Sequence, residues 1–150
     1  MVRPSAVVVA ISLCVWTGGC SSNPATPSAA NYEGKWNGTT SQGSSISFTI
    51  SADDKVTSIT VGYSFNGCSG TQTFSNLNLD LAPDVPCIPG PCPAGVTSFR
   101  GFGYGVTSAD GSMTSVNGLF PFPGRAQGVV AFTNYPACGT ALGIAWTATR

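Results

Sequence analysis

The sequence predicts an all-β fold, an antiparallel barrel or sandwich of about eight strands that disulfide bonds stabilise. Three observations support this prediction. The chain holds 19 Gly and 11 Pro and few stretches of helix-forming residues. Apolar residues alternate with polar ones, as at Ile46, Phe48 and Ile50, and this period of two is typical of a half-buried strand. The segment after residue 31 carries an even set of cysteines, as disulfide-bonded exported domains do.

Segments with the alternating pattern follow one another about every 10–15 residues, with turn formers between them. The segments that we expect to form strands are 32–40, 45–51, 55–65, 73–81, 96–106, 112–120, 126–133 and 141–149. Within 55–65 the apolar period breaks between Val56 and Ile59, which predicts a β-bulge. We expect Trp36 and Trp146 to pack in the core where the first and last strands meet.

Residues 51–59 (SADDKVTSI) and 108–116 (SADGSMTSV) form a partial repeat. Asp followed by Asp or Gly favours a tight hairpin turn, so Asp53, Asp54 and Asp110 are interpreted as turn formers. Two origins remain open, an old duplication or two independent solutions to the same hairpin.

The amino terminus has the pattern of an export signal. Arg3 precedes an apolar run over residues 5–16, which is shorter than the about 20 residues of a membrane-spanning helix. A positive flank, a short apolar run and small residues after it are typical of a secretory signal peptide.

Gly18 and Gly19 directly precede Cys20, and this TGGC segment resembles the lipobox of bacterial lipoproteins, although Thr17 stands where that family usually has Leu. The resemblance implies that Cys20 receives a diacylglycerol and that the signal is removed just before it. Ser21, in place of the Asp that retains such proteins at the inner membrane, implies the outer membrane in a bacterium that has one. Plain secretion, with cleavage near Ala25 or Ala29, is the alternative.

The sequence thus divides into a signal peptide (1–19), a lipidated cysteine with a flexible tether (20–31) and a single β-domain (32–150). The tether is rich in Ser, Pro and Ala and has no large apolar side chain, which is typical of a spacer. Its residues reach at most about 35–40 Å when extended.

Four cysteines of the domain allow three pairings. CIPGPC places Cys87 and Cys92 on either side of a Pro-Gly-Pro turn, so we expect the pairs Cys87–Cys92 and Cys68–Cys138. Zinc sites usually contain two CxxC-like pairs, and this spacing is absent. We therefore expect neither a metal site nor a cofactor.

Two apolar segments are candidate binding surfaces. The loop 82–95 is rich in proline, and stiff loops lose little entropy when they bind a partner; its candidate residues are Pro86, Ile88, Pro89 and Pro91. Phe120 and Phe122 flank Pro121, either as an exposed lip or as a strand end directed inward.

Gly34 and Trp36 form a Gly-x-Trp motif at the start of the first expected strand. This motif resembles the start of the lipocalin barrels, which implies that Trp36 closes the base of a barrel and that Arg150 lies over it. The same start also resembles small bacterial barrel-type protease inhibitors.

The composition restricts the possible functions. The chain has no histidine, which excludes the usual Ser-His-Asp and Cys-His nucleophile systems. Its formal net charge is zero, so no basic field attracts nucleic acid.

We expect a lipid-anchored protein of the bacterial cell envelope whose non-enzymatic domain binds a protein or a small apolar ligand. The alternatives are a lipocalin-like carrier, a protease inhibitor, and a glycan hydrolase using two of Glu33, Asp80 and Asp84.

Overall fold

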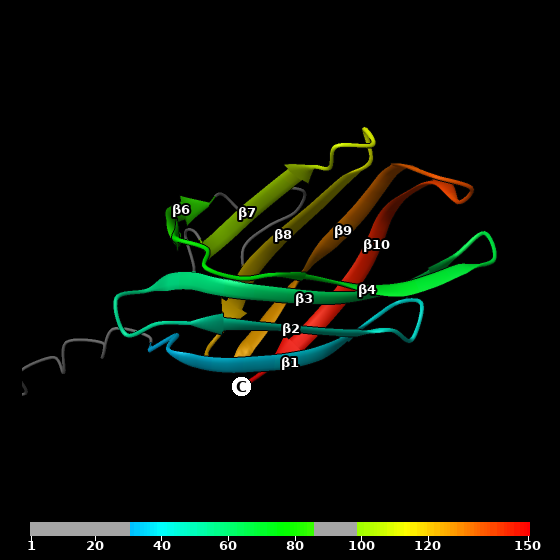
Figure 1. Cartoon of the computed structure of the whole chain (residues 1–150). Coiled ribbons are helices and arrows are strands. Elements are labelled where there is room, and N and C mark those ends of the chain that lie inside the picture. Colours follow the sequence, from blue (N-terminus) through cyan, green and yellow to red (C-terminus); the bar gives the residue numbers. More distant parts are fainter. Residues whose placement is uncertain (1–30, 86–98) are drawn as a thin grey trace, which may run out of the picture.

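Residues 31–85 and 99–150, which the computed structural model describes, contain ten strands and no helix (Figure 1). The strands are β1 (Gly34–Thr40), β2 (Ser45–Ile50), β3 (Lys55–Phe65), β4 (Cys68–Phe74), β5 (Leu79–Asp80), β6 (Ala82–Val85), β7 (Phe99–Thr107), β8 (Met113–Phe122), β9 (Arg125–Tyr135) and β10 (Gly139–Thr149). All the strand pairs are antiparallel. The all-β prediction is confirmed.

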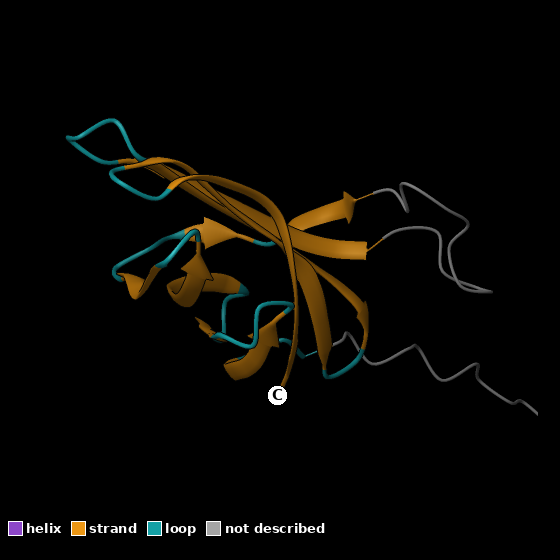
Figure 2. Cartoon of the chain, turned by 90° about the vertical axis from the view of Figure 1, so that its right-hand side faces the viewer, coloured by secondary structure: helices purple, strands orange, loops and turns teal. Residues whose placement is uncertain are grey.

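The strands belong to one sheet in the order β4-β3-β2-β1-β10-β9-β8-β7-β6, with β5 paired to β3. The first and last strands, β1 and β10, pair in the middle of this order. The two ends of the sheet, β4 and β6, do not pair with each other. Figures 1 and 2 show that the β1–β4 half lies across the β7–β10 half. The fold is therefore a single sheet rolled over its own core and left open at one seam.

The structure has more strands than the pattern predicts. The alternation predicts one strand over 73–81, but within it only the end of β4 and the two residues of β5 are strand. Asn76 interrupts the segment because its φ of 57° lies in the left-handed region. Cys68, which looks loop-like in sequence, begins β4. This edge strand is mostly exposed, so its sequence needs little apolar alternation.

The predicted β-bulge in β3 is confirmed. Ile50 pairs with Val56 whereas Thr49 pairs with Ser58, so Thr57 is the extra residue. The bulge shifts the strand by one residue. Val56 and Ile59, on either side of it, are both completely buried as a result.

Aromatic rings fill the space between the two halves of the sheet. One group is Trp36, Phe48, Phe102, Phe120 and Trp146, and the other is Tyr63, Phe65, Phe132 and Tyr135. Contacting rings within the groups have centroids 5.1 to 6.4 Å apart, the range of aromatic pairs. Gly128 makes room for this packing, since a Cβ there would lie 2.7 Å from Trp146 Cζ2. Trp36 and Trp146 are core residues, as expected.

The two copies of the repeat form the same hairpin turn. In each, the amide of the first serine, Ser51 or Ser108, donates to the carbonyl four residues later, at 2.9 and 2.8 Å. The fourth residue, Asp54 or Gly111, has a positive φ, of 59° and 82°. The expected turn role of the repeat is confirmed, and both explanations of its origin are compatible with this geometry.

A disulfide joins the open sheet at one end. Cys68, at the start of β4, is bonded to Cys138 in the turn between β9 and β10, with 5.8 Å between their Cα atoms. The predicted pairing is confirmed. Beside it, Asn66 Nδ2 donates to the Cys138 carbonyl at 2.7 Å.

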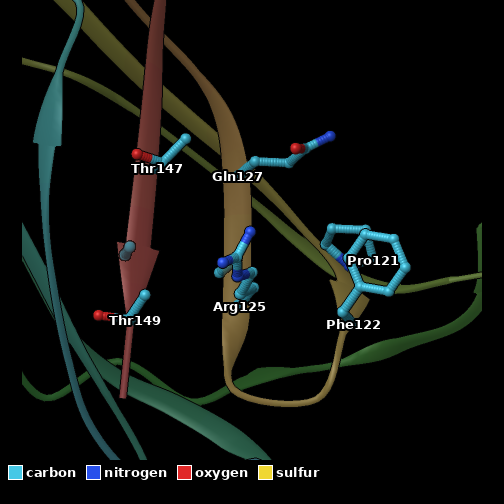
Figure 3. A pocket seen from close by; sticks show the side chains of 8 residues that line it. Pro121, Phe122, Arg125, Gln127, Thr147 and Thr149 are labelled. Atoms are coloured by element: carbon cyan, nitrogen blue, oxygen red, sulfur yellow. The ribbon is translucent and has the colours of Figure 1, made fainter.

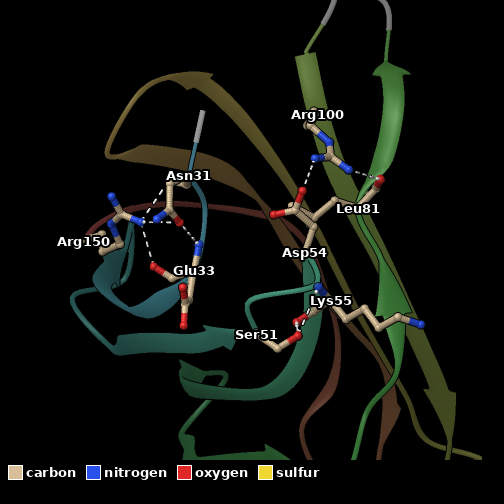
Figure 4. Close-up of polar contacts among 8 residues, drawn as sticks. All are labelled: Asn31, Glu33, Ser51, Asp54, Lys55, Leu81, Arg100 and Arg150. Atoms are coloured by element: carbon tan, nitrogen blue, oxygen red, sulfur yellow. Dashed lines mark hydrogen bonds and ion pairs between the residues drawn. The ribbon is translucent and has the colours of Figure 1, made fainter. Parts of the chain in front are cut away.

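At the other end, the chain of β5 and β6 crosses the seam, because β5 pairs with β3, the Leu81 amide donates to the Asp54 carbonyl at 3.2 Å, and β6 pairs with β7. Side chains add to this backbone pairing. Arg100 of β7 forms an ion pair with Asp54 and donates to the Leu81 carbonyl at 3.2 Å (Figure 4). Further along the seam, the rings of Phe74 in β4 and Tyr104 in β7 have centroids 4.9 Å apart. These contacts hold β7 against the β3–β4 half.

Candidate functional site

The chain enters the described domain beside the end of β10. Arg150 follows β10, and its Nη1 donates to the carbonyls of Asn31 and Glu33 at 2.9 and 2.7 Å (Figure 4). The Arg150 amide donates to the carbonyl of Gly124, in the turn between β8 and β9, at 3.4 Å. Residue 31 is therefore fixed close to the β8–β9 turn.

The Gly-x-Trp motif lies under this contact. Trp36 is buried, and its Nε1 donates to the Tyr32 carbonyl at 2.9 Å. The guanidinium carbon of Arg150 lies 5.9 Å from the Trp36 ring centroid, within cation–π range. Gly34 has a φ of 122°, a backbone conformation that is nearly restricted to glycine. The arginine–tryptophan contact that the lipocalin resemblance implies is thus present, while the resemblance itself stays a prediction.

A groove lies on the outer face of β8, β9 and β10 at this end, and we call it the turn groove (Figure 3). Its volume is about 230 Å³, and the side chains labelled in Figure 3 are Pro121, Phe122, Arg125, Gln127, Thr147 and Thr149. The Phe122 side chain is 50% exposed. The groove combines an exposed aromatic ring, a cation and hydroxyl groups.

Phe120 does not belong to this surface: of the two alternatives, the strand end directed inward is confirmed for Phe120, and its assignment as a candidate binding residue is wrong. Its ring is 4% exposed and packs 5.0 Å from Tyr32 and 5.2 Å from Trp36, measured between centroids. Strand alternation alone would put Phe120 and Phe122 on the same face. The pairing of β8 with β9 is irregular between Leu119 and Phe122, and this irregularity turns Phe122 outward.

A larger groove lies over β7, and we call it the β7 groove. Its volume is about 470 Å³. Outward-facing residues of β6, β7, β8 and β9 line it, namely Ala82, Gly101, Gly103, Asn117, Leu119 and Val129. Between residues 101 and 105 the glycines leave the outer face of β7 without side chains, so the backbone at Gly101 and Gly103 forms the floor of the groove. Leu119 and Val129 make one wall apolar.

Two carboxylates of the hydrolase alternative, Glu33 and Asp80, line neither groove. Asp80 of β5 forms an exposed ion pair with Lys55, 3.3 Å between Oδ1 and Nζ. Glu33 contributes its backbone carbonyl to the Arg150 contact. The side chain of Asp84, the third candidate, lies outside the described part.

Three groups among the described residues have shifted pKa values. The hydroxyl of Ser51 lowers the pKa of Asp53, and the hydroxyl and amide of Ser112 lower the pKa of Asp110. Burial raises the pKa of Tyr135, partly offset by its hydrogen bond with Thr114. None of these shifts moves a pKa towards neutral pH, so they do not mark a group prepared for acid–base chemistry at pH 7.

Several predicted site residues lie outside the described residues. They are Cys20, the pair Cys87–Cys92, and the loop residues Pro86, Ile88, Pro89 and Pro91. The sequence reasoning also missed the β7 groove, although the glycines at 101, 103 and 105 carry a signal for it. Glycine at alternate positions of a strand removes all side chains from one face.

Within residues 31–85 and 99–150, no group of three or more His, Cys, Asp or Glu side chains could hold a metal ion. The same part of the chain contains no helix that could span a membrane. Searches against protein-family models, curated proteins and solved structures found no match to this chain.

Proposed function

We propose that the chain is a lipid-anchored protein of the bacterial cell envelope whose β-domain binds a small apolar ligand without catalysing a reaction. The observation that carries the binding role is the β7 groove, with its volume of about 470 Å³, its backbone floor and the apolar wall formed by Leu119 and Val129. Apolar concave surfaces with a few polar groups are typical ligand sites. Asn117 supplies such a polar group at the edge of the groove.

The packing of the core favours this surface site over the internal cavity of a lipocalin-like carrier. Rings from both halves of the sheet are in contact across the interior, as in the Phe48–Phe102 pair at 5.3 Å and the Tyr63–Phe132 pair at 5.1 Å. A ligand placed between them would separate rings that now touch, and the lost contacts would oppose its entry.

The anchor rests on the sequence TGGC at residues 17–20. Two or more acyl chains give stable membrane attachment, whereas one chain gives only marginal binding. We expect the wild-type chain to incorporate labelled palmitate in bacterial cells and the Cys20→Ala variant to leave the membrane fraction. An unlabelled wild-type band would contradict the anchor.

The binding role is tested by filling the β7 groove. Gly103 does not need a positive φ, and a new Cβ would approach only the Asn117 side-chain oxygen, at 3.0 Å. Gly103→Val should therefore fold and place a branched side chain on the groove floor. Gly105→Val is the matched control, because it adds the same side chain to β7 in open space outside the groove lining.

The measurement is titration with the apolar dye Nile red, followed by displacement with candidate ligands from envelope extracts. We expect Gly103→Val to weaken dye binding by roughly tenfold or more, and Gly105→Val to bind as the wild type does. Equal dye binding by both variants would contradict a ligand site in this groove.

A further inference from the structure

We propose that the β8–β9 turn and the turn groove contact the surface of the lipid bilayer. In this arrangement Phe122 enters the interface and Arg125 lies at the level of the lipid phosphates. The inference rests on the lipid anchor of the proposed function and adds an orientation to it: the domain meets the membrane with one particular end.

The path of the chain supports this orientation. The described domain begins at Asn31, and ten residues (21–30) separate it from the start of the tether at Cys20. Arg150 binds the Asn31 carbonyl through its side chain and the Gly124 carbonyl through its amide. Asn31, where the tether ends, therefore lies next to the β8–β9 turn, and the extended length of the tether places this point within about 35–40 Å of the lipidated Cys20.

The side chains of the turn fit an interface between water and lipid. Phe122 is half exposed although it is a large apolar residue, and Pro121 lies beside it in the turn groove (Figure 3). Phe, like Trp and Leu, is typical of the apolar face that interfacial proteins bury at the boundary between headgroups and acyl chains. Arg125, across the turn from Phe122, places a cation where anionic headgroups attract it.

The distribution of charge also favours the β8–β9 turn as the part of the domain that faces the membrane. Arg125 and Arg150 lie on the side of β8–β10, together with the acid Glu33. The acids Asp53 and Asp54 belong to the β2–β3 turn, on the other side of the same end. Asp54 is paired with Arg100 and Lys55 follows it, so that turn offers an anionic surface no excess of positive charge. Arg125 and Arg150 outnumber Glu33 on the β8–β10 side, which favours contact of the β8–β9 turn with anionic lipid.

A tryptophan at position 122 can report the contact. The full chain is incorporated into vesicles of phosphatidylcholine and phosphatidylglycerol, and vesicle flotation first measures whether it is anchored. Phe122→Trp is compared with Leu142→Trp, which replaces another exposed apolar residue, 70% exposed, near the opposite end of the sheet. Fluorescence of the parent chain, with its native tryptophans, is subtracted from both.

We expect lipids with brominated acyl chains to quench the added fluorescence of Phe122→Trp and to leave that of Leu142→Trp unchanged. Adding Arg125→Gln should reduce the quenching in vesicles that contain phosphatidylglycerol. If the chain floats with the vesicles but both tryptophans are quenched equally by aqueous iodide, the contact is wrong and the anchor stands.

If the chain does not float, the anchor of the proposed function is wrong. The contact is then tested by adding the same vesicles to the unanchored chain. Quenching of Phe122→Trp alone supports the contact, and its absence overturns it.

Discussion

The guanidinium of Arg150, just after β10, covers the ring of Trp36 in β1, with 5.9 Å between the guanidinium carbon and the ring centroid. The same side chain donates to the carbonyls of Asn31 and Glu33. One arginine therefore connects the entry of the domain, the core tryptophan and the last strand.

Replacing Arg150 with alanine should lower the free energy of unfolding by about 1–2 kcal/mol, because the cation–π contact and its charge-assisted hydrogen bonds are lost together. Denaturant unfolding of the full chain measures this loss. Arg125→Ala is the control, since Arg125 is also exposed and forms no ion pair with any described residue. It should change stability by less than about 0.5 kcal/mol. A loss below about 0.5 kcal/mol in the Arg150→Ala variant would contradict the structural role of Arg150.

The Cys68–Cys138 disulfide closes a loop with a sequence separation of 70 residues. In the chain-entropy model such a loop contributes about 4 kcal/mol by restricting the unfolded chain. Cys138→Ser should therefore lower the melting temperature strongly, and Cys68→Ser should lower it equally. The double variant should lose no more than either single variant, because both break the same bond. Additive losses would argue against this pairing.

Cys92 belongs to the second expected disulfide. The Cys87–Cys92 bond would close a much shorter loop, so Cys92→Ser should cost less stability than Cys138→Ser. Thermal unfolding of the two variants under the same oxidising conditions makes the comparison. Equal losses would contradict the short loop that the Cys87–Cys92 pairing implies.

Gly111 tests whether the repeat needs a left-handed residue at its fourth position. Its φ is 82°, and a Cβ added to it would meet no other atom within 4 Å, so a substitution there acts through backbone strain alone. Gly111→Ala should destabilise the domain by about 1 kcal/mol. Gly111→Asn should cost less, because Asn tolerates this region. Equal stability of the alanine variant and the wild type would contradict the turn assignment.

Alternation predicts the buried strands well because one face of each is fully in the core. Ile46, Phe48 and Ile50 of β2 are each 1% exposed, and the interrupted period at Val56 and Ile59 locates the bulge. The same rule does not find β4, whose side chains are largely solvated and carry little apolar signal.

The grooves are harder to predict because they depend on the pairing of strands and on irregularities in it. The glycines of β7 signal a bare strand face, but its walls come from other strands, as where β8 places Asn117 opposite Gly103. Phe122 leaves the face that its position in the strand predicts because the register shifts after Leu119. Neither relationship is encoded within a single strand.

Asp110 should make the stability of the domain depend on pH in the acid range. Its carboxylate accepts hydrogen bonds from the hydroxyl and the amide of Ser112, at 2.7 and 2.9 Å, and these lower its pKa in the folded state below the ordinary 3.8. A lowered folded-state pKa gives stability that is present above the unfolded-state pKa and is lost as the pH falls through the folded-state value.

Carboxyl titration by NMR should therefore find Asp110 more than half ionised at a pH where an ordinary Asp is half protonated. Ser112→Ala removes the hydroxyl, which is the larger cause, and leaves the amide, so the pKa of Asp110 should rise only part of the way towards 3.8. In denaturant unfolding between about pH 2 and pH 5, Asp110→Asn should reduce the slope of stability against pH. An Asp110 that titrates at its ordinary value in the wild type would refute the interaction.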